Sequence, residues 1–157
     1  MDWETALDVF VHGDGDGEYE PPAIPKVEGL TGIIEHSICS KPFEKQLTKS
    51  DLSLSQRGLL LCKSDVEECL LPLLNDDEDI REGIPVITYT MDGKKYRMVF
   101  QLRISRNFYV LGDDGWIQFQ RENDLEVEDS VTIWMFRHVR TKNLCFVIAR
   151  SAYFIRN

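Results

Sequence analysis

Long apolar runs, catalytic signatures and closely spaced cysteine pairs are all missing from this sequence of 157 residues. No stretch approaches the roughly 18 consecutive apolar residues that a membrane-spanning helix needs, and the first residues are acidic where a secretory signal would be basic. There is also no paired set of catalytic carboxylates, no serine or cysteine signature with histidine, and no glycine-rich phosphate loop. We therefore expect a soluble intracellular protein that is not an enzyme and uses no cofactor.

The cysteines show no two-residue spacing, although structural zinc ligands usually come as close-spaced pairs. Cys62, Cys69 and Cys145 fall in apolar runs or on an apolar helix face, which is typical of core thiols. Free thiols indicate a reducing compartment. The alternative is a zinc site that combines cysteine with histidine, and its candidate ligands are Cys39, Cys62, Cys69, Cys145, His12, His36 and His138.

Positive charge is scarce, with 18 Lys and Arg against 27 Asp and Glu and a net charge of −9. Residues 1–40 contain nine acidic residues and one lysine, so most of the acidity belongs to this segment. The stretch 75–82 adds five acidic residues and one arginine, and we interpret its acidic part, Asp76 to Asp79, as a solubilising loop. The rest of the chain has no charge deficit that would exclude an anionic partner.

Glycine, proline and like charges dominate residues 14–29, a composition that buries too little apolar area to offset the entropy of ordering. We predict an acidic, largely flexible tail over residues 1–40 and a folded domain over residues 41–157. Apolar residues nevertheless recur at helical spacing near the start, at Trp3, Leu7, Phe10 and Val11. This face could dock on a protein partner, and the alternatives are that it packs on its own domain or frays.

Short β-branched and aromatic runs between turn signals predict about seven strands, and the absence of βαβ alternation favours an antiparallel barrel or sandwich. The clearest turn is the Asp92–Gly93 pair. The runs lie around Leu47 and at residues 57–63, 85–90, 96–104, 108–112, 130–138 and 143–151.

Two short helices interrupt these strands. Ser64 and Glu67 have the spacing of a capping box before an apolar helix face. A second helix begins near Asp113 or Asp114, with Trp116 and Phe119 three residues apart. We predict that these two aromatic residues are buried in the core, together with Trp134 and Phe136.

The order of these signals resembles the plant B3 DNA-binding domain. The resemblance rests on "KQLTKSDLS", an arginine-led apolar strand, a helix ending in "LLPL", the hairpin "TYTMDGKKYRMVF" and the stretch "YVLGDDGWIQFQRENDLEVEDSVTIWMF". It covers about residues 43–150. It implies a mainly β fold, a seven-stranded open β pseudobarrel with two short α-helices, and two arms that grip the DNA major groove. The glycine that precedes the late aspartate in many relatives is Glu128 here.

The resemblance also implies which residues lie on the two arms. Arginine can pair with guanine, asparagine or glutamine with adenine, and lysine or serine mostly holds phosphate. The first arm would contain Lys45, Lys49, Ser50, Ser53, Ser55, Gln56, Arg57 and Lys63, and the second Arg103, Ser105, Arg106 and Asn107.

The implied function is sequence-selective binding of double-stranded DNA by a nuclear regulator of plant transcription. Such a protein would contact neither a membrane nor a small-molecule substrate. One alternative is a B3-like module whose DNA surface has degenerated and which binds another protein, for example through its acidic tail. A more remote alternative is the recognition domain of a restriction nuclease.

Overall fold

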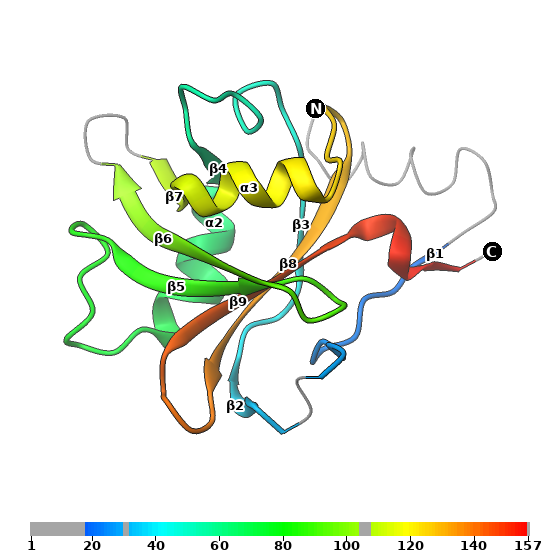
Figure 1. The fold of residues 1–157 in the computed structure, drawn as a ribbon. Coiled ribbons are helices and arrows are strands. Elements are labelled where there is room, and N and C mark those ends of the chain that lie inside the picture. Colours follow the sequence, from blue (N-terminus) through cyan, green and yellow to red (C-terminus); the bar gives the residue numbers. More distant parts are fainter. Residues whose placement is uncertain (1–17, 30–31, 104–107, 157) are drawn as a thin grey trace.

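The computed structural model describes residues 18–29, 32–103 and 108–156. The strands are β1 (Glu18–Tyr19), β2 (Ile34–Cys39), β3 (Phe43–Gln46), β4 (Gly58–Leu61), β5 (Ile84–Tyr89), β6 (Lys95–Arg103), β7 (Phe108–Gly112), β8 (Ser130–His138), β9 (Leu144–Arg150) and β10 (Ile155–Arg156). The seven predicted runs correspond to β3 to β9, which curl into a half-barrel (Figure 1). This confirms the predicted open pseudobarrel with helices.

The main sheet has the order β2-β8-β9-β5-β6-β7-β4, and β3 also pairs with β8. Both β2 and β3 lie along one edge of β8: Phe43 faces Ile133, and Ile34 faces His138. The expectation of purely antiparallel strands is wrong for one pair, because β5 and β9 run parallel. The chain between them passes through β6 to β8, and this is long enough for the crossover that parallel strands require.

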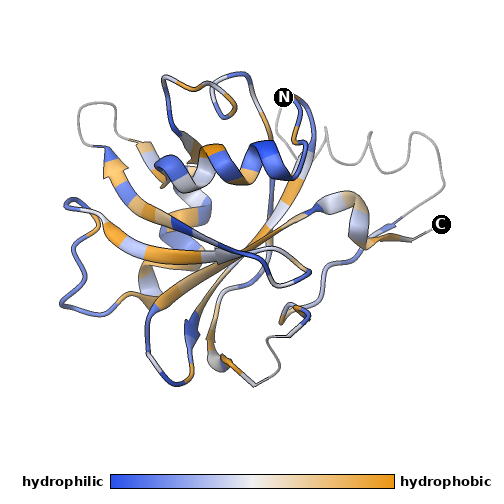
Figure 2. Cartoon of the chain, viewed as in Figure 1, coloured by the Kyte–Doolittle hydropathy of each residue, from blue (hydrophilic) through white to orange (hydrophobic). Residues whose placement is uncertain are grey.

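Side chains inside the half-barrel form the main core, in which Trp116, Phe119 and Phe100 are buried. A second cluster on the outer face of the sheet contains Trp134 and Phe136, so the four predicted core aromatics are all buried but on two faces. Strand β8 is buried from Val131 to Arg137 because both of its faces are covered. This explains its almost continuous apolar sequence, visible in Figure 2.

The first predicted helix differs from the capping-box expectation. It consists of α2 (Lys63–Asp65), a π-helical turn η1 (Val66–Leu70) and a 3-10 turn η2 (Leu71–Leu73). Cys62 occupies the N-cap without a side-chain capping bond, and Ser64 lies inside the helix. The chain turns after Pro72, which cannot donate a backbone hydrogen bond. None of the helices in the described ranges is long and apolar enough to cross a bilayer.

The second helix, α3 (Asp114–Glu122), begins where the sequence predicts. Its buried residues are Trp116 and Phe119, whose rings stack with centroids 5.8 Å apart. Gly115 is required at the start of α3, since a Cβ atom there would collide with the backbone carbonyl of Arg97. The helix therefore lies close against β6 (Figure 1).

Residues 18–29, which we call the strap, pack against the outer face of the sheet. The backbone of Glu20 donates to Phe154 in the 3-10 turn η3 (Ser151–Phe154), and the Trp134 indole donates to the Pro22 carbonyl over 3.0 Å. The Tyr19 hydroxyl bonds Thr132, and burial raises the pKa of Tyr19 to about 12. The flexibility predicted for residues 1–40 stays a prediction, and residues 1–17 lie outside the described ranges.

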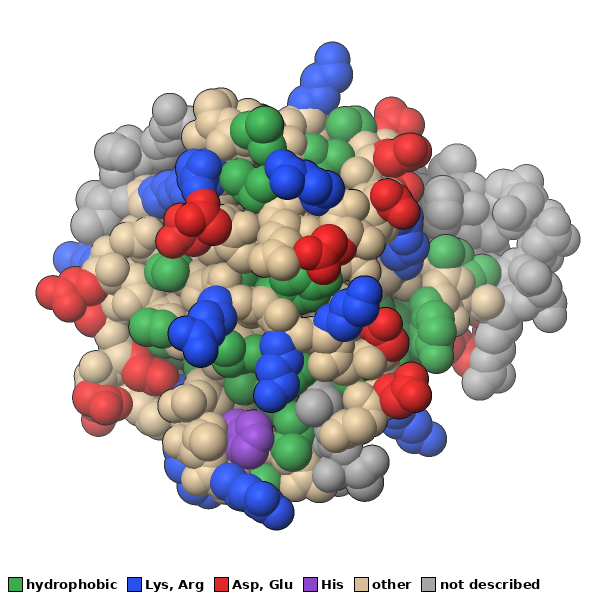
Figure 3. Space-filling model, viewed as in Figure 1, with side chains coloured by type: hydrophobic (Ala, Val, Ile, Leu, Met, Phe, Trp, Pro, Cys, Tyr) green, Lys and Arg blue, Asp and Glu red, His purple; other side chains and the backbone are tan. Residues whose placement is uncertain are grey.

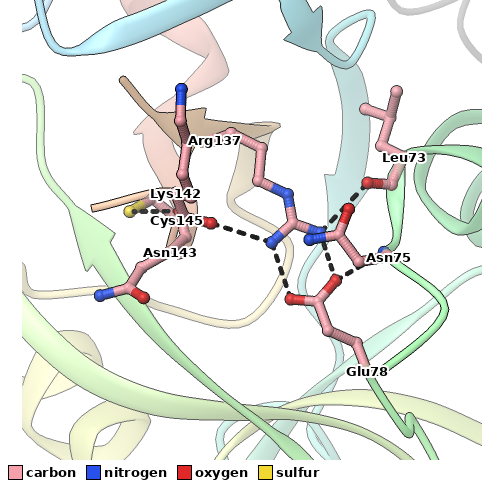
Figure 4. A network of polar contacts seen from close by, with 7 residues as sticks. All are labelled: Leu73, Asn75, Glu78, Arg137, Lys142, Asn143 and Cys145. Atoms are coloured by element: carbon pink, nitrogen blue, oxygen red, sulfur yellow. Dashed lines mark hydrogen bonds and ion pairs between the residues drawn. The ribbon is translucent and has the colours of Figure 1, made fainter. Parts of the chain in front are cut away.

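The acidic loop after η2 has a structural role that sequence reasoning missed. Glu78 forms a two-pronged ion pair with Arg137, whose side chain is only 3% exposed (Figure 4). Arg137 also donates to the carbonyls of Leu73 and Lys142, at 3.2 and 3.1 Å. The interpretation of Asp76 to Asp79 as a solubilising loop is therefore wrong for Glu78, which connects the loop to β8.

Candidate nucleic-acid interface

The first arm, residues 47–57, connects β3 to β4 and is organised around the carboxylate of Asp51, which is fully buried. This carboxylate accepts hydrogen bonds from the Thr48 amide at 2.8 Å, the Thr48 hydroxyl at 3.0 Å and the Leu60 amide at 2.9 Å. The Asp51 carbonyl accepts the Trp116 indole N–H at 2.7 Å. A polar loop at the surface is thus fixed to both the sheet and α3.

Lys45, at the base of this arm, pairs with the Asp51 carboxylate at 3.4 Å, and its side chain is 21% exposed. Its position indicates that Lys45 balances the buried charge of Asp51. The Ser53 and Ser55 hydroxyls form a hydrogen bond with one another at 2.9 Å. The Ser53 hydroxyl also accepts a hydrogen bond from the backbone N–H of Gln56 at 3.4 Å. These contacts hold the tip of the arm in one conformation.

Arg57 ends the arm in the left-handed region, at φ 54°, and forms an ion pair with Asp114 at the start of α3. Its carbonyl accepts the amide of Asp113 at 2.8 Å, which locks the end of the arm to the helix. Arg103, from the end of β6, reaches the Gln56 carbonyl at 2.9 Å. The two arms are therefore connected by a direct hydrogen bond.

The second arm lies between β6 and β7, and its predicted contact residues Ser105, Arg106 and Asn107 fall outside the described residues. Its described neighbours are Arg103 and Phe108, which face one another in the β6–β7 pair. Lys63 follows β4, whose last residue Leu61 pairs with Tyr109 at the start of β7. Lys63 therefore lies at the end of the sheet where the second arm joins β7.

Figure 1 shows the first arm above α3 and the end of β6 on the same side of the half-barrel. Lys and Arg side chains occur along this side in Figure 3, with acidic side chains between them. Lys49, Ser50, Ser55 and Lys63 are exposed. Within the described ranges, Lys49 and Lys63 have no carboxylate partner in an ion pair, so their charges are available to an external anion.

Leu54 is the one large apolar side chain on the first arm that is mostly exposed, at 59%. Sequence reasoning selected the polar residues on either side of it and missed it. The only available signal was its position between Ser53 and Ser55 in an otherwise polar loop.

Two of the four cysteines have thiols that are largely shielded from solvent. Burial raises the pKa of Cys39 and of Cys145 to about 11, so both thiols are protonated at neutral pH. In the part of the chain that the structure describes, no three His, Cys, Asp or Glu residues are grouped to hold a metal ion.

Comparison with known protein families gives a direct match. The sequence model of the B3 DNA binding domain matches residues 43–152. The chain belongs to the B3 DNA-binding domain family. This is a DNA-binding family and not a family of enzymes, and the match confirms the resemblance inferred from the sequence.

Two curated proteins of Arabidopsis thaliana are similar to this chain. The protein At4g03170, whose name assigns it a B3 domain, is 40% identical over 119 residues, covering 75% of this chain and 47% of that protein. B3 domain-containing protein At1g20600 is 37% identical over 94 residues, covering 59% and 39%. The chain thus spans about half the length, or less, of these two curated relatives.

Two solved DNA complexes from Arabidopsis are also similar to this B3 domain. The FUS3–DNA complex has a TM-score of 0.48 and 24% identity, and covers 68% of this chain and 93% of that chain. The complex of transcription factor LEC2 with DNA has a TM-score of 0.45 and 24% identity, and covers 69% and 95%.

Proposed function

We propose that this B3 domain binds double-stranded DNA sequence-selectively, with its two arms in the major groove, as part of a nuclear regulator of plant transcription. The observation that carries the proposal is the first arm, in which the buried Asp51 carboxylate fixes the base through Thr48 and Leu60 and leaves a polar tip exposed. A fixed loop loses little conformational entropy on binding and can present hydrogen-bonding groups in one register. Membership of a DNA-binding family supports the same conclusion.

The geometry suggests that two groups of residues contact different parts of the DNA. Lys49 and Lys63 are exposed and suited to phosphate contacts, which position the protein without reading sequence. Gln56 and Arg57 are candidates for base contacts, since glutamine can pair with adenine and arginine with guanine. The second arm would add Arg106 and Asn107 in the same way.

One set of contacts favours the alternative of a degenerate DNA surface that binds another protein. Arg57 is paired with Asp114, and Arg103 donates to the Gln56 carbonyl. Both guanidinium groups already have partners inside the domain and would have to exchange or share them to reach a base. A direct binding measurement distinguishes the two functions.

The test is a salt titration of DNA affinity for the wild type, Lys49→Ala, Lys63→Ala and the matched control Lys94→Ala. Lys94 is exposed next to the β5–β6 turn, at the opposite end of β6 from the arms. Lys49→Ala and Lys63→Ala should each reduce the slope of log affinity against log salt by about one, because one phosphate contact is lost. The control should keep the wild-type slope.

Sequence selectivity requires a second measurement, in which the preferred duplex is first selected from random sequences. We expect the selected duplex to bind at least about 10³-fold more tightly than a scrambled duplex at physiological salt. Absence of DNA binding at low salt, or an affinity that is independent of sequence, would favour the protein-binding alternative.

A further inference from the structure

A cavity of about 520 Å³ opens at the end of the half-barrel where the β5–β6 turn, α3 and η3 meet. It lies beside the C-terminal half of α3, and the first arm contacts the same helix through the Arg57–Asp114 ion pair and through hydrogen bonds from Trp116 and Gln120. Its wall is mostly apolar and includes Met91, Phe119, Leu125, Val131, Ile148 and Tyr153. The Tyr153 side chain at its edge is 69% exposed, the largest exposure among the described large hydrophobic residues.

The polar groups around this cavity already have partners within the domain. Arg150 donates to the Asp129 carboxylate at 2.8 Å and to the carbonyls of Asn123 and Asp124 at 2.7 Å each. The Asn123 amide donates to the Phe119 carbonyl at 2.8 Å. A polar ligand would have to break these bonds, so the cavity favours an occupant that offers apolar side chains.

The first described residues of the chain lie next to the same cavity. Glu18 and Tyr19 pair with Arg156 and Ile155, directly after the η3 turn that contributes Ala152 and Tyr153 to the cavity (Figure 1). The 17 residues that precede Glu18 contain Trp3, Leu7 and Phe10 at helical spacing, and within residues 2–12 the acidic residues Asp2, Glu4 and Asp8 fall outside that face. An apolar segment is thus attached to the edge of an apolar cavity.

We propose that the cavity is the docking site of the chain's own amino-terminal segment, residues 2–12, with Trp3, Leu7 and Phe10 as the inserted side chains. Five residues from Gly13 to Gly17 span up to about 17 Å when extended, and they are attached to Glu18 beside the η3 turn that lines the cavity. Eleven helical residues would add about 16 Å of apolar face. Tethering to the strap makes docking intramolecular and raises the effective concentration of the segment.

The test is acrylamide quenching of Trp3 fluorescence in the full chain. Trp116 and Trp134 are fully buried, and a Trp3→Phe variant supplies their signal for subtraction. Ala152→Glu places a charge at the cavity edge, and Ala23→Glu makes the same change at an exposed site in the strap outside the cavity. We expect Trp3 to be protected from acrylamide in the wild type and in Ala23→Glu. In Ala152→Glu the quenching constant of Trp3 should rise several-fold.

A Phe10→Ser variant tests the other side of the contact without altering the described domain, and it should expose Trp3 as Ala152→Glu does. Thermal melting of each variant confirms that the domain stays folded. The proposal would be overturned if Trp3 in the wild type were as accessible to acrylamide as a free tryptophan. It would also be overturned if Trp3 were equally protected in Ala152→Glu. Protection that increases with protein concentration would also overturn it, because the occupant would then be a second copy of the chain.

Discussion

At the scale of single residues, several backbone positions adopt a conformation that glycine favours. Glu128 has φ 78°, and its amide donates to the Leu47 carbonyl at 2.8 Å, which ties the loop before β8 to the base of the first arm. This is the position at which the resemblance to the B3 family implies glycine. The side chain of Glu128 is exposed, so the cost of its conformation is not offset by packing.

Replacing Glu128 with glycine should stabilise the domain. A non-glycine residue pays about 1–2 kcal/mol in the left-handed region, while glycine adds about 0.5–1 kcal/mol of backbone entropy. We expect a net gain of about 0.5–1 kcal/mol, measured by urea unfolding. The matched Glu126→Gly change, at an exposed residue without a positive φ, should lower stability by about 0.5–1 kcal/mol. A loss in both variants would contradict this explanation.

Leu54 can be tested as a base contact, provided that the domain binds DNA as proposed. The thymine methyl is the apolar group that the major groove offers to such a side chain. Replacing the contacted thymine by uracil should weaken wild-type binding about fourfold, the equivalent of about 0.8 kcal/mol for one buried methyl-sized group. Leu54→Ala should bind both duplexes equally. Additive effects of the two changes would show that Leu54 does not touch the methyl group.

At the scale of elements, the loop after η2 and strand β8 are joined by the Glu78–Arg137 ion pair. Burial raises the pKa of Glu78, but the Arg137 hydrogen bonds, the Asn75 amide and the Arg137 charge outweigh it, so the pKa lies below its ordinary value of 4.5. The ionised form is therefore favoured in the folded state. Its contribution to stability is complete above about pH 4.5 and is lost as the pH falls through the lower folded-state value.

Glu78→Gln should destabilise the domain by about 3 kcal/mol at pH 7, because it leaves a buried arginine without its counter-charge. The difference from the wild type should shrink as the pH falls below about 4.5. The double variant Glu78→Met with Arg137→Met should lose less than the sum of the single variants. A difference that stays constant down to pH 3, or additive losses, would contradict the assigned role of the pair.

At the scale of the whole molecule, two apolar clusters share the sheet. The main core fills the half-barrel, and the second cluster packs Val27 of the strap and Ile34 of β2 against Trp134. The family match begins at residue 43, after both of these segments. The strap and β2 therefore cover an apolar face that the matched region would otherwise expose.

Two truncations test where the folded domain begins. Removing residues 1–17 leaves every described contact in place, whereas removing residues 1–40 also deletes the strap and β2. We expect the second truncation to cost at least about 3 kcal/mol more, the value of two buried aliphatic side chains at about 1.5 kcal/mol each. Urea unfolding of both fragments measures the difference. Equal stability would place the boundary near residue 40.

Much of the secondary structure could be predicted because it is encoded by neighbours in the chain. The β-branched and aromatic runs of β5 and β6, the Asp92–Gly93 turn and the spacing of Trp116 and Phe119 are local patterns, and each appears where expected. The helix after β4 was less predictable, since Ser64 matches a capping box yet Cys62 takes the cap. The polar character of the first arm could also be predicted from the sequence.

The seven strands, the two helical segments and the polar character of the first arm depend on residues close together in the chain, so all of them could be predicted. Which charged side chains form ion pairs and hydrogen bonds follows from the folded structure alone. Arg103 bonds Gln56 across 47 positions, and Arg137 pairs with Glu78 across 59. No local pattern encodes such pairs, since many carboxylates and carbonyls could satisfy one guanidinium and the fold selects among them. For the same reason, the composition of the strap predicts a linker, whereas in the folded protein Val27 of the strap packs against apolar side chains of β8 and β9.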